Sequence, residues 1–365
     1  MSLQNESMAR GSALAARLAG DAHPWRDQRV MVVGAGFTGT VIARELADAG
    51  VHVDLLEERD HIGGNAFDEI DAYGIRVHRY GPHLFHTSNM QVVDWLSRFT
   101  DWLPYRHRVK ALLADGRHVT LPVNRETAAI VGAENVLDTF YRPYSRKMWG
   151  LELEALDPSI IARVPVREDL NEDYFPNDSF QALPSDGYTA MFERILSHDR
   201  ITVHLGTRYL RGMEAGYAHC FNSMPIDAYF DFSLGELPYR SIRFHTFTLP
   251  LPNALPAVTV NFTHDGPYTR VTEWKLLPGH GGNPHHTTLT FDEPCDYRDN
   301  RMQRYYPVKD ASGANRALAA RYRSLLDPKM RFVGRCGTYA YLDMHQAVSH
   351  ALAVAADTLP RSRDT

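Results

Sequence analysis

The stretch RVMVVGAGFTGTVIARELADAGVHVDLLE, residues 29–57, decides the fold. Residues 29–33 form an apolar run typical of a buried strand, and a glycine-rich turn follows them. Residues 40–49 have the character of a helix, and the strand-like run 51–56 ends on Glu57. A strand, a glycine turn, a helix and a second strand ending on an acid predict a dinucleotide-binding βαβ unit.

Each residue of this pattern meets a physical need. Gly34 turns the chain, Gly36 lets a diphosphate approach the backbone, and Gly39 lets the helix pack close to its strand. The turn, with Phe37, places a helix N-terminus and its partial positive charge beside that diphosphate. Glu57 is placed to accept hydrogen bonds from the adenosine ribose hydroxyls.

A second glycine pair follows at once in RDHIGGN, residues 59–65. Glycines there indicate a backbone that passes close to a bulky cofactor, although an ordinary glycine turn is the alternative. Together with the first motif, the pair favours FAD over NAD. We therefore expect the cofactor to be lined also by Glu58, Gly63, Gly64 and Asn65.

Composition narrows the class of protein. The chain has 365 residues, enough for two or three domains, and 44% hydrophobic with 23% charged residues is ordinary for a globular protein. The formal charge is −5 and the basic residues are scattered, so the sequence shows no basic patch typical of nucleic-acid binding. Three cysteines without a C-x-x-C pair argue against a disulfide framework or zinc site and fit a reducing cytoplasm.

The chain ends and the middle segments complete the predicted organisation. No apolar run reaches the length of a membrane span, and residues 1–28 are interpreted as a disordered extension, with a weak amphipathic helix at 8–19 as an alternative. Further strands are expected at 74–78, 109–121 (with a hairpin turn at 114–116), 257–262, 287–291 and 331–334. The region around 160–300 is expected to form antiparallel sheet. A helical patch is expected at 124–147 and a last helix from near Asp343.

These elements predict an α/β fold with α+β insertions. A Rossmann-like FAD-binding domain is expected to carry an inserted antiparallel-sheet domain and a small helical domain. The predicted ranges are 29–90, 200–230 and 305–360 for the FAD-binding domain, 91–150 for the helical domain, and 105–123, 160–199 and 231–304 for the substrate domain.

Further strings carry a resemblance to a known family. They are YGPHLFHT (80–87), YSRKMWG (144–150), IARVPVR (161–167), NFT (261–263), PYTR (267–270), YYPV (305–308), GR (334–335) and YLDMHQ (341–346). In this order the chain resembles UDP-galactopyranose mutase over about residues 29–356. That family comprises FAD enzymes that interconvert the pyranose and furanose forms of a nucleotide sugar.

The resemblance implies a chemistry without net redox change. The flavin must be reduced, by an external reductant such as NAD(P)H, and its N5 forms a covalent adduct with the sugar. A cytoplasmic enzyme acting on UDP-galactopyranose, UDP-galactofuranose or a related nucleotide sugar is implied, with no metal and no nucleic acid. A homodimer is left open.

The resemblance also implies roles for substrate-binding residues. Arg163 matches the family's mobile-loop arginine, whose planar guanidinium closes on the diphosphate; the alternative is a solvated loop charge. Tyr174, Tyr306 and Tyr341 match tyrosines that bind phosphate oxygens or line the sugar pocket, although a tyrosine alone is more often a core residue. Asn261 matches a motif position in the substrate site, and Arg270 is expected near the diphosphate or ribose.

Three aromatic residues resemble the family's nucleobase pocket. They are Phe140, Tyr144 and Trp149, and the alternative for Trp149 is a buried anchor of the helical patch.

The remaining matches lie near the flavin. His83 is expected beside the isoalloxazine, and a metal site formed with His86 is a weak alternative because no third ligand is evident. Arg335, Asp343 and Met344 match flavin-side positions, and the helix opening at Asp343 would aim its positive end at the anionic reduced flavin. Asp343 is alternatively only an N-cap. We therefore assign catalysis to Arg163, His83, Tyr341 and Asp343.

The chain departs from the family in two places. Phe291 stands where a basic residue is expected to make a second contact to the diphosphate, and Arg298, Arg301 or Arg304 are candidate replacements. The helical segment before Tyr144 is also short. Two alternative functions remain: an FAD-dependent oxidoreductase of the amine-oxidase-like group, and a flavin-binding paralogue without turnover, which Phe291→Arg would distinguish.

Overall fold

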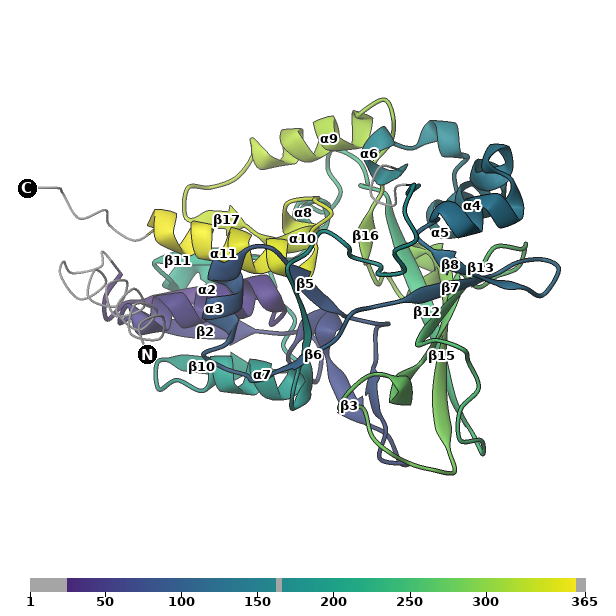
Figure 1. Cartoon of the computed structure of the whole chain (residues 1–365). Helices are drawn as coiled ribbons and strands as arrows, with labels where there is room; N and C mark the ends of the chain where they lie inside the picture. Colours follow the sequence, from purple (N-terminus) through teal and green to yellow (C-terminus); the bar gives the residue numbers. More distant parts are fainter. Residues whose placement is uncertain (1–24, 162–165, 359–365) are drawn as a thin grey trace, which may run out of the picture. The chain divides into compact units, whose positions relative to one another are not determined.

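The computed structural model describes residues 25–161 and 166–358 and consists of two compact units. Unit 1 contains residues 1–64, 190–233 and 322–365, and unit 2 contains residues 65–189 and 234–321. Figure 1 shows the chain coloured along its sequence. Arg163 and most of the extension predicted at 1–28 lie outside the described residues. The predicted three-domain ranges stay a prediction.

Unit 1 is built on a five-stranded parallel sheet, ordered β10-β2-β1-β11-β17. Its strands are β1 (Arg29–Val33), β2 (His52–Leu56), β10 (Ile201–His204), β11 (His219–Asn222) and β17 (Met330–Phe332). The strand order reverses direction between β1 and β11. In open α/β sheets this switch point, at the carboxyl ends of the strands, is where ligands bind.

Helix α2 (Phe37–Asp48) packs on this sheet. It contacts β1 and β2 and also α11 (Met344–Thr358) (Figure 1). Most α2 residues are therefore buried, and α11 buries Val348, Ala351, Val354 and Ala355. The predicted βαβ unit and closing helix are confirmed, with α2 starting directly after Gly36 rather than at Thr40. Short helices α8 (Ile226–Tyr229) and α10 (Gly334–Gly337) also belong to unit 1.

Unit 2 contains a seven-stranded sheet, ordered β16-β12-β15-β14-β13-β7-β8. Its strands are β7 (Val109–Leu112), β8 (His118–Leu121), β12 (Tyr239–Leu249), β13 (Thr259–Phe262), β14 (Arg270–Glu273), β15 (Thr287–Asp296) and β16 (Tyr306–Pro307). The hairpin predicted at 109–121 is confirmed as β7–β8. The sheet predicted to be antiparallel is mixed, because β13 pairs with β7 in parallel.

Smaller elements complete unit 2. They are β3 (Asp68–Ile70), β4 (Arg76–His78), β5 (Phe85–Thr87), β6 (Trp102–Pro104), β9 (Phe180–Pro184), α3 (Met90–Leu96), α4 (Arg125–Val131), α5 (Arg142–Trp149) and α6 (Pro158–Ile161). Helices α7 (Gly187–Leu196) and α9 (Ala314–Arg323) cross the boundary between the units. The predicted helical patch is confirmed as α4 and α5, and the Asn124 side chain caps α4 by accepting a bond from the Thr127 N–H at 2.9 Å.

Register and side-chain alternation give the large sheet two chemically different faces. Asn261 pairs with Arg270, and Arg270 pairs with Asp292, so these three residues form one rung across β13, β14 and β15. The adjacent rung contains Val260, Val271 and Phe291. Because neighbouring residues of a strand point to opposite faces, the polar rung and the apolar rung face opposite sides.

Among the described residues, no helix is both long and apolar enough to cross a bilayer.

Candidate functional site

In the first glycine turn of unit 1, Gly34 and Gly39 leave no room for a side chain. Gly34 has a φ of +98°, and a Cβ there would lie 2.0 Å from the Ser223 hydroxyl oxygen at the end of β11. A Cβ on Gly39 would lie 1.9 Å from the Gly34 carbonyl oxygen. The turn therefore sits at the switch point of the sheet, and Gly39 brings α2 against it as predicted.

The second glycine pair packs directly on the first. The Gly63 N–H donates to the Ala35 carbonyl oxygen at 2.9 Å. Gly64 has a φ of +56°, and a Cβ there would lie 2.9 Å from the Gly36 Cα. Two bare backbone turns thus meet beside the first turn of α2, an arrangement that fits a diphosphate held by backbone N–H groups.

Glu57 is held in place by the same turn. One carboxylate oxygen accepts from the Ala35 N–H at 2.8 Å and the other from the Arg59 N–H at 3.0 Å. An ionised carboxylate has about four acceptor positions, so Glu57 retains capacity for ribose hydroxyls. The adjacent Glu58 is exposed, and Phe37 packs on Phe192 with ring centroids 4.8 Å apart, which makes Phe37 a packing residue here.

The C-terminal motif of unit 1 clusters around the start of α11. Arg335 donates to the Leu342 carbonyl oxygen at 2.5 Å, and its guanidinium lies 5.3 Å from the Tyr341 ring centre. The Asp343 N–H donates to the Gln346 side chain at 2.9 Å, half of a capping box. Asp343 thus occupies the N-cap, with Met344 the first helical residue, and its role toward a flavin stays a prediction.

Unit 2 presents a partly buried ion pair on the polar rung. The Arg270 Nε–H donates to an Asp292 oxygen at 2.6 Å; the Asp292 side chain is fully buried, whereas that of Arg270 is 31% exposed. Burial alone would lower the pKa of Arg270, but Asp292 and the nearby phenols of Tyr306 and Tyr144 raise it. Arg270 is therefore a fixed cation beside two of the predicted substrate tyrosines.

Asp292 was not predicted from the sequence. The sequence feature that could have identified it is a single acid on the face of β15 that also carries Thr288 and Thr290. Burial raises the pKa of Asp292, and Arg270 opposes that rise.

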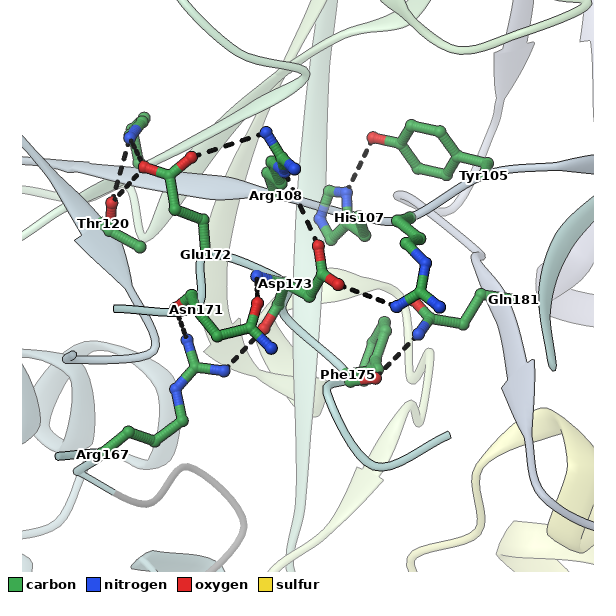
Figure 2. A network of polar contacts seen from close by, with 12 residues as sticks. Tyr105, His107, Arg108, Thr120, Arg167, Asn171, Glu172, Asp173, Phe175 and Gln181 are labelled. Carbon is green, nitrogen blue, oxygen red and sulfur yellow. Dashed lines mark hydrogen bonds and ion pairs between the residues drawn. The ribbon is translucent and has the colours of Figure 1, made fainter. Parts of the chain in front are cut away.

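A polar network fixes the segment that carries Tyr174 (Figure 2). Arg167 donates to the Asp173 and Asn171 carbonyl oxygens at 2.8 and 2.6 Å, while Glu172 accepts from Lys110 at 2.8 Å. The Tyr174 N–H then donates to the His107 carbonyl oxygen at 2.7 Å.

The His107 ring lies beside Tyr174. Its centroid is 5.6 Å from that of Tyr174, and its Nδ1 lies 3.0 Å from the Tyr105 hydroxyl. Burial, together with Arg270 and His86, lowers the pKa of His107 to about 3. His107 is therefore neutral at physiological pH, and no sequence motif pointed to this residue.

The three predicted nucleobase-pocket residues have different environments. Phe140 belongs to an apolar core cluster against which Tyr174 packs. Trp149 is 6% exposed and meets the Tyr306 ring edge to face at 6.4 Å, so it is a buried anchor in this structure. Tyr144 is 42% exposed. Stacking of a nucleobase stays a prediction.

His83 is partly buried and adjoins two buried histidines. Its backbone N–H donates to His78 Nδ1 at 3.0 Å, and His78 Nε2 lies 3.0 Å from His280 Nε2. Burial lowers the pKa of His280 to about 4 and that of His78 well below its usual value. Within the described residues, no group of three or more histidines, cysteines or acids could hold a metal ion.

Phe291 does not lie with Arg270. It packs against Phe247 and Phe262, with ring centroids 5.5 and 5.9 Å away, on the opposite face of the sheet. Of the candidate replacements, Arg298 pairs with Asp296 at 2.9 Å, and the Arg304 guanidinium lies 4.5 Å from the Tyr297 ring centre. Phe291 therefore faces away from Arg270, and the expected gap beside the diphosphate stays a prediction.

Comparison with known proteins identifies the family. The sequence profile described as UDP-galactopyranose mutase matches residues 139–341, and one for NAD(P)-binding Rossmann-like domains matches residues 32–99. The chain is 34% identical to a probable UDP-galactopyranose mutase of Klebsiella pneumoniae, over 91% of this chain and 95% of that protein.

The chain belongs to the UDP-galactopyranose mutase family. It is thus a member of a family of nucleotide-sugar pyranose/furanose mutases. It is also 33% identical to dTDP-fucopyranose mutase of Escherichia coli, over 90% of this chain and 97% of that protein.

Several solved structures share the fold of this chain. A crystal structure of reduced UDP-galactopyranose mutase superposes with a TM-score of 0.69 at 15% identity, covering 90% of this chain and 93% of that one. A putative protoporphyrinogen oxidase from Exiguobacterium superposes with a TM-score of 0.63 at 14% identity, covering 91% and 98%. At these identities the likeness concerns the fold alone.

Proposed function

We propose that this protein interconverts the pyranose and furanose forms of a nucleotide sugar on a reduced FAD, with UDP-galactose as the first candidate sugar nucleotide. The observation that supports this most is Arg270, a cation fixed by a buried carboxylate beside Tyr306 and Tyr144. Arginine suits a diphosphate because its guanidinium donates several hydrogen bonds in one plane. An enzyme that merely oxidises an amine has no need of such a site.

The residues of unit 1 fit FAD. The bare backbone around Gly36 and Gly64 would receive the diphosphate of the cofactor, and Glu57 would bind its ribose. When bound and reduced, the flavin supplies a nucleophile for the anomeric carbon of the sugar. Arg335 and the N-terminus of α11 after Asp343 would stabilise negative charge on it.

The residues of unit 2 would hold the departing nucleoside diphosphate. Its negative charge increases as the bond to the sugar breaks, so a fixed cation stabilises the transition state more than the bound substrate. Arg270 supplies that cation, and Tyr174 and Tyr306 of unit 2 remain proposed hydroxyl donors, as does Tyr341 of unit 1. Arg163 remains the proposed second cation.

The test is turnover of defined sugars. The protein would be reduced with dithionite without oxygen, supplied with UDP-galactofuranose or dTDP-fucofuranose, and its products separated by chromatography. Conversion of either sugar to its pyranose form supports the proposal, and the faster one identifies the substrate. If a flavin-loaded protein converts neither sugar, the proposal is wrong.

An FAD-dependent oxidoreductase is the second candidate. The fold is shared with putrescine oxidase, at a TM-score of 0.57 and 14% identity, a likeness that concerns the fold and not the reaction. This second candidate predicts that oxidised flavin, rather than reduced flavin, consumes the substrate.

A further inference from the structure

The Asp292 carboxylate is buried, and one of its two oxygens has no hydrogen-bond partner among the described residues. The Asp292 side chain has no exposed surface, and its Oδ2 accepts the bond from Arg270 Nε at 2.6 Å. Its Oδ1 is buried and has no hydrogen-bond partner within residues 25–161 and 166–358. A carboxylate oxygen without a partner in the interior disfavours the ionised form.

Among the described residues, one positive charge acts on Asp292. On β14 this is Arg270, and on β13 the rung continues with Asn261, whose own Oδ1 is also buried without a partner in the described part of the chain. On β12 the residue opposite Asp292 is Phe244, which is apolar. The ionised state of Asp292 therefore depends on Arg270.

The other titratable groups around Arg270 do not compensate Asp292. His107 is neutral at physiological pH because its pKa is about 3. Tyr144 and Tyr306, from α5 and β16, are phenols and add no positive charge.

We propose that Asp292 is a positioning residue for Arg270 and that it takes up one proton from solvent when the diphosphate of a nucleotide sugar binds to Arg270. This inference rests on the function proposed above. A bound diphosphate places negative charge on the guanidinium that compensates Asp292, and like charges in one site favour protonation. The proton goes to Oδ1, so Oδ2 continues to accept from Arg270 and the guanidinium keeps its orientation.

Proton uptake makes binding depend on pH. Because the complex holds one proton more than the free protein, a higher pH weakens binding. Within the range between the free and bound pKa values of Asp292, each pH unit changes the dissociation constant by about tenfold.

The experiment is titration calorimetry of the oxidised, FAD-loaded protein with UDP-galactose, whose diphosphate is esterified at both ends and does not titrate near neutral pH. Titrations in two buffers of different ionisation enthalpy, at several pH values between about 5.5 and 8.5, give the number of protons taken up. We expect up to about one proton per bound ligand for the wild type. Asp292→Asn should bind UDP-galactose with no such uptake and with a nearly pH-independent dissociation constant.

A matched control is Asp54→Asn. Asp54 is another buried aspartate, paired with Arg29 at 2.6 Å, but it lies on β2 of unit 1. This variant should take up protons as the wild type does.

Two results would overturn the inference while leaving the proposed function intact: binding by the wild type without proton uptake, or unchanged uptake in Asp292→Asn. If neither UDP-galactose nor dTDP-fucose binds the wild type, the proposed function fails, and the inference fails with it.

Discussion

Replacing Arg270 by methionine leaves a fully buried carboxylate without its counter-ion, and we expect a large loss of stability that depends on pH. Opposite charges about 4 Å apart attract by about 4 kcal/mol at an effective dielectric constant near 20. Breaking a buried pair by removing one partner costs about 3–5 kcal/mol. Because Asp292 has no exposed surface, we expect the upper part of that range wherever it is ionised.

The sign of the pH dependence follows from the direction of the pKa shift. Burial raises the pKa of Asp292 above its unfolded value, so the folded protein retains its proton to a higher pH than the unfolded chain does. Stability therefore falls as pH rises from the unfolded to the folded pKa. Arg270→Met removes the cation that opposes the rise in the pKa of Asp292. The loss of stability with increasing pH should therefore extend to a higher pH than in the wild type, and it should be greatest above the folded pKa of Asp292.

The assay is urea unfolding followed by circular dichroism, at acidic and at mildly alkaline pH. It would compare the wild type, Arg270→Met, Asp292→Asn and the double variant. The double variant should be more stable than Arg270→Met at high pH, because it has no buried charge to strand. The reasoning is refuted if Arg270→Met stays within about 0.5 kcal/mol of the wild type at high pH.

Three further predictions test other parts of the molecule. Gly64→Ala places a Cβ 2.9 Å from the Gly36 Cα at a φ of +56°, so the purified protein should contain far less flavin by absorbance. The control is Gly116→Ala, whose Cβ would meet no described atom within 4 Å. Equal flavin content in the two variants would contradict a cofactor site at Gly36 and Gly64. Arg163→Ala, a prediction from sequence, should reduce turnover by orders of magnitude with FAD still bound, and wild-type turnover would exclude its role at the diphosphate. Trp274→Phe removes the bond from the indole N–H to Thr290 at 2.7 Å and should cost about 0.5–1.5 kcal/mol, with an unchanged melting temperature as the contrary result.

The sequence predicted those features that depend on neighbouring residues. The βαβ unit was predictable because glycines of the turn, helix and terminal acid follow one another within residues 29–57. The N-cap at Asp343 and the hairpin at β7–β8 are likewise local. Motif order, rather than periodicity, identified the family.

Features set by long-range register were not predictable. Arg270 and Asp292 meet only because β14 and β15 pair in one particular register, and the same register turns Phe291 to the other face. Sequence reasoning therefore named Arg270 and Phe291 but did not find Asp292, the partner of Arg270. The neutral state of His107 also depends on burial by segments distant in sequence, which no local pattern records.

The most direct test of the central claim follows the flavin during turnover. Under anaerobic conditions, the reduced protein would receive an excess of UDP-galactofuranose or dTDP-fucofuranose, while flavin absorbance and sugar products are measured together. The account predicts many pyranose molecules formed per flavin, with the flavin still reduced at the end. Oxidation of one flavin for each sugar consumed would show an oxidoreductase and contradict the account.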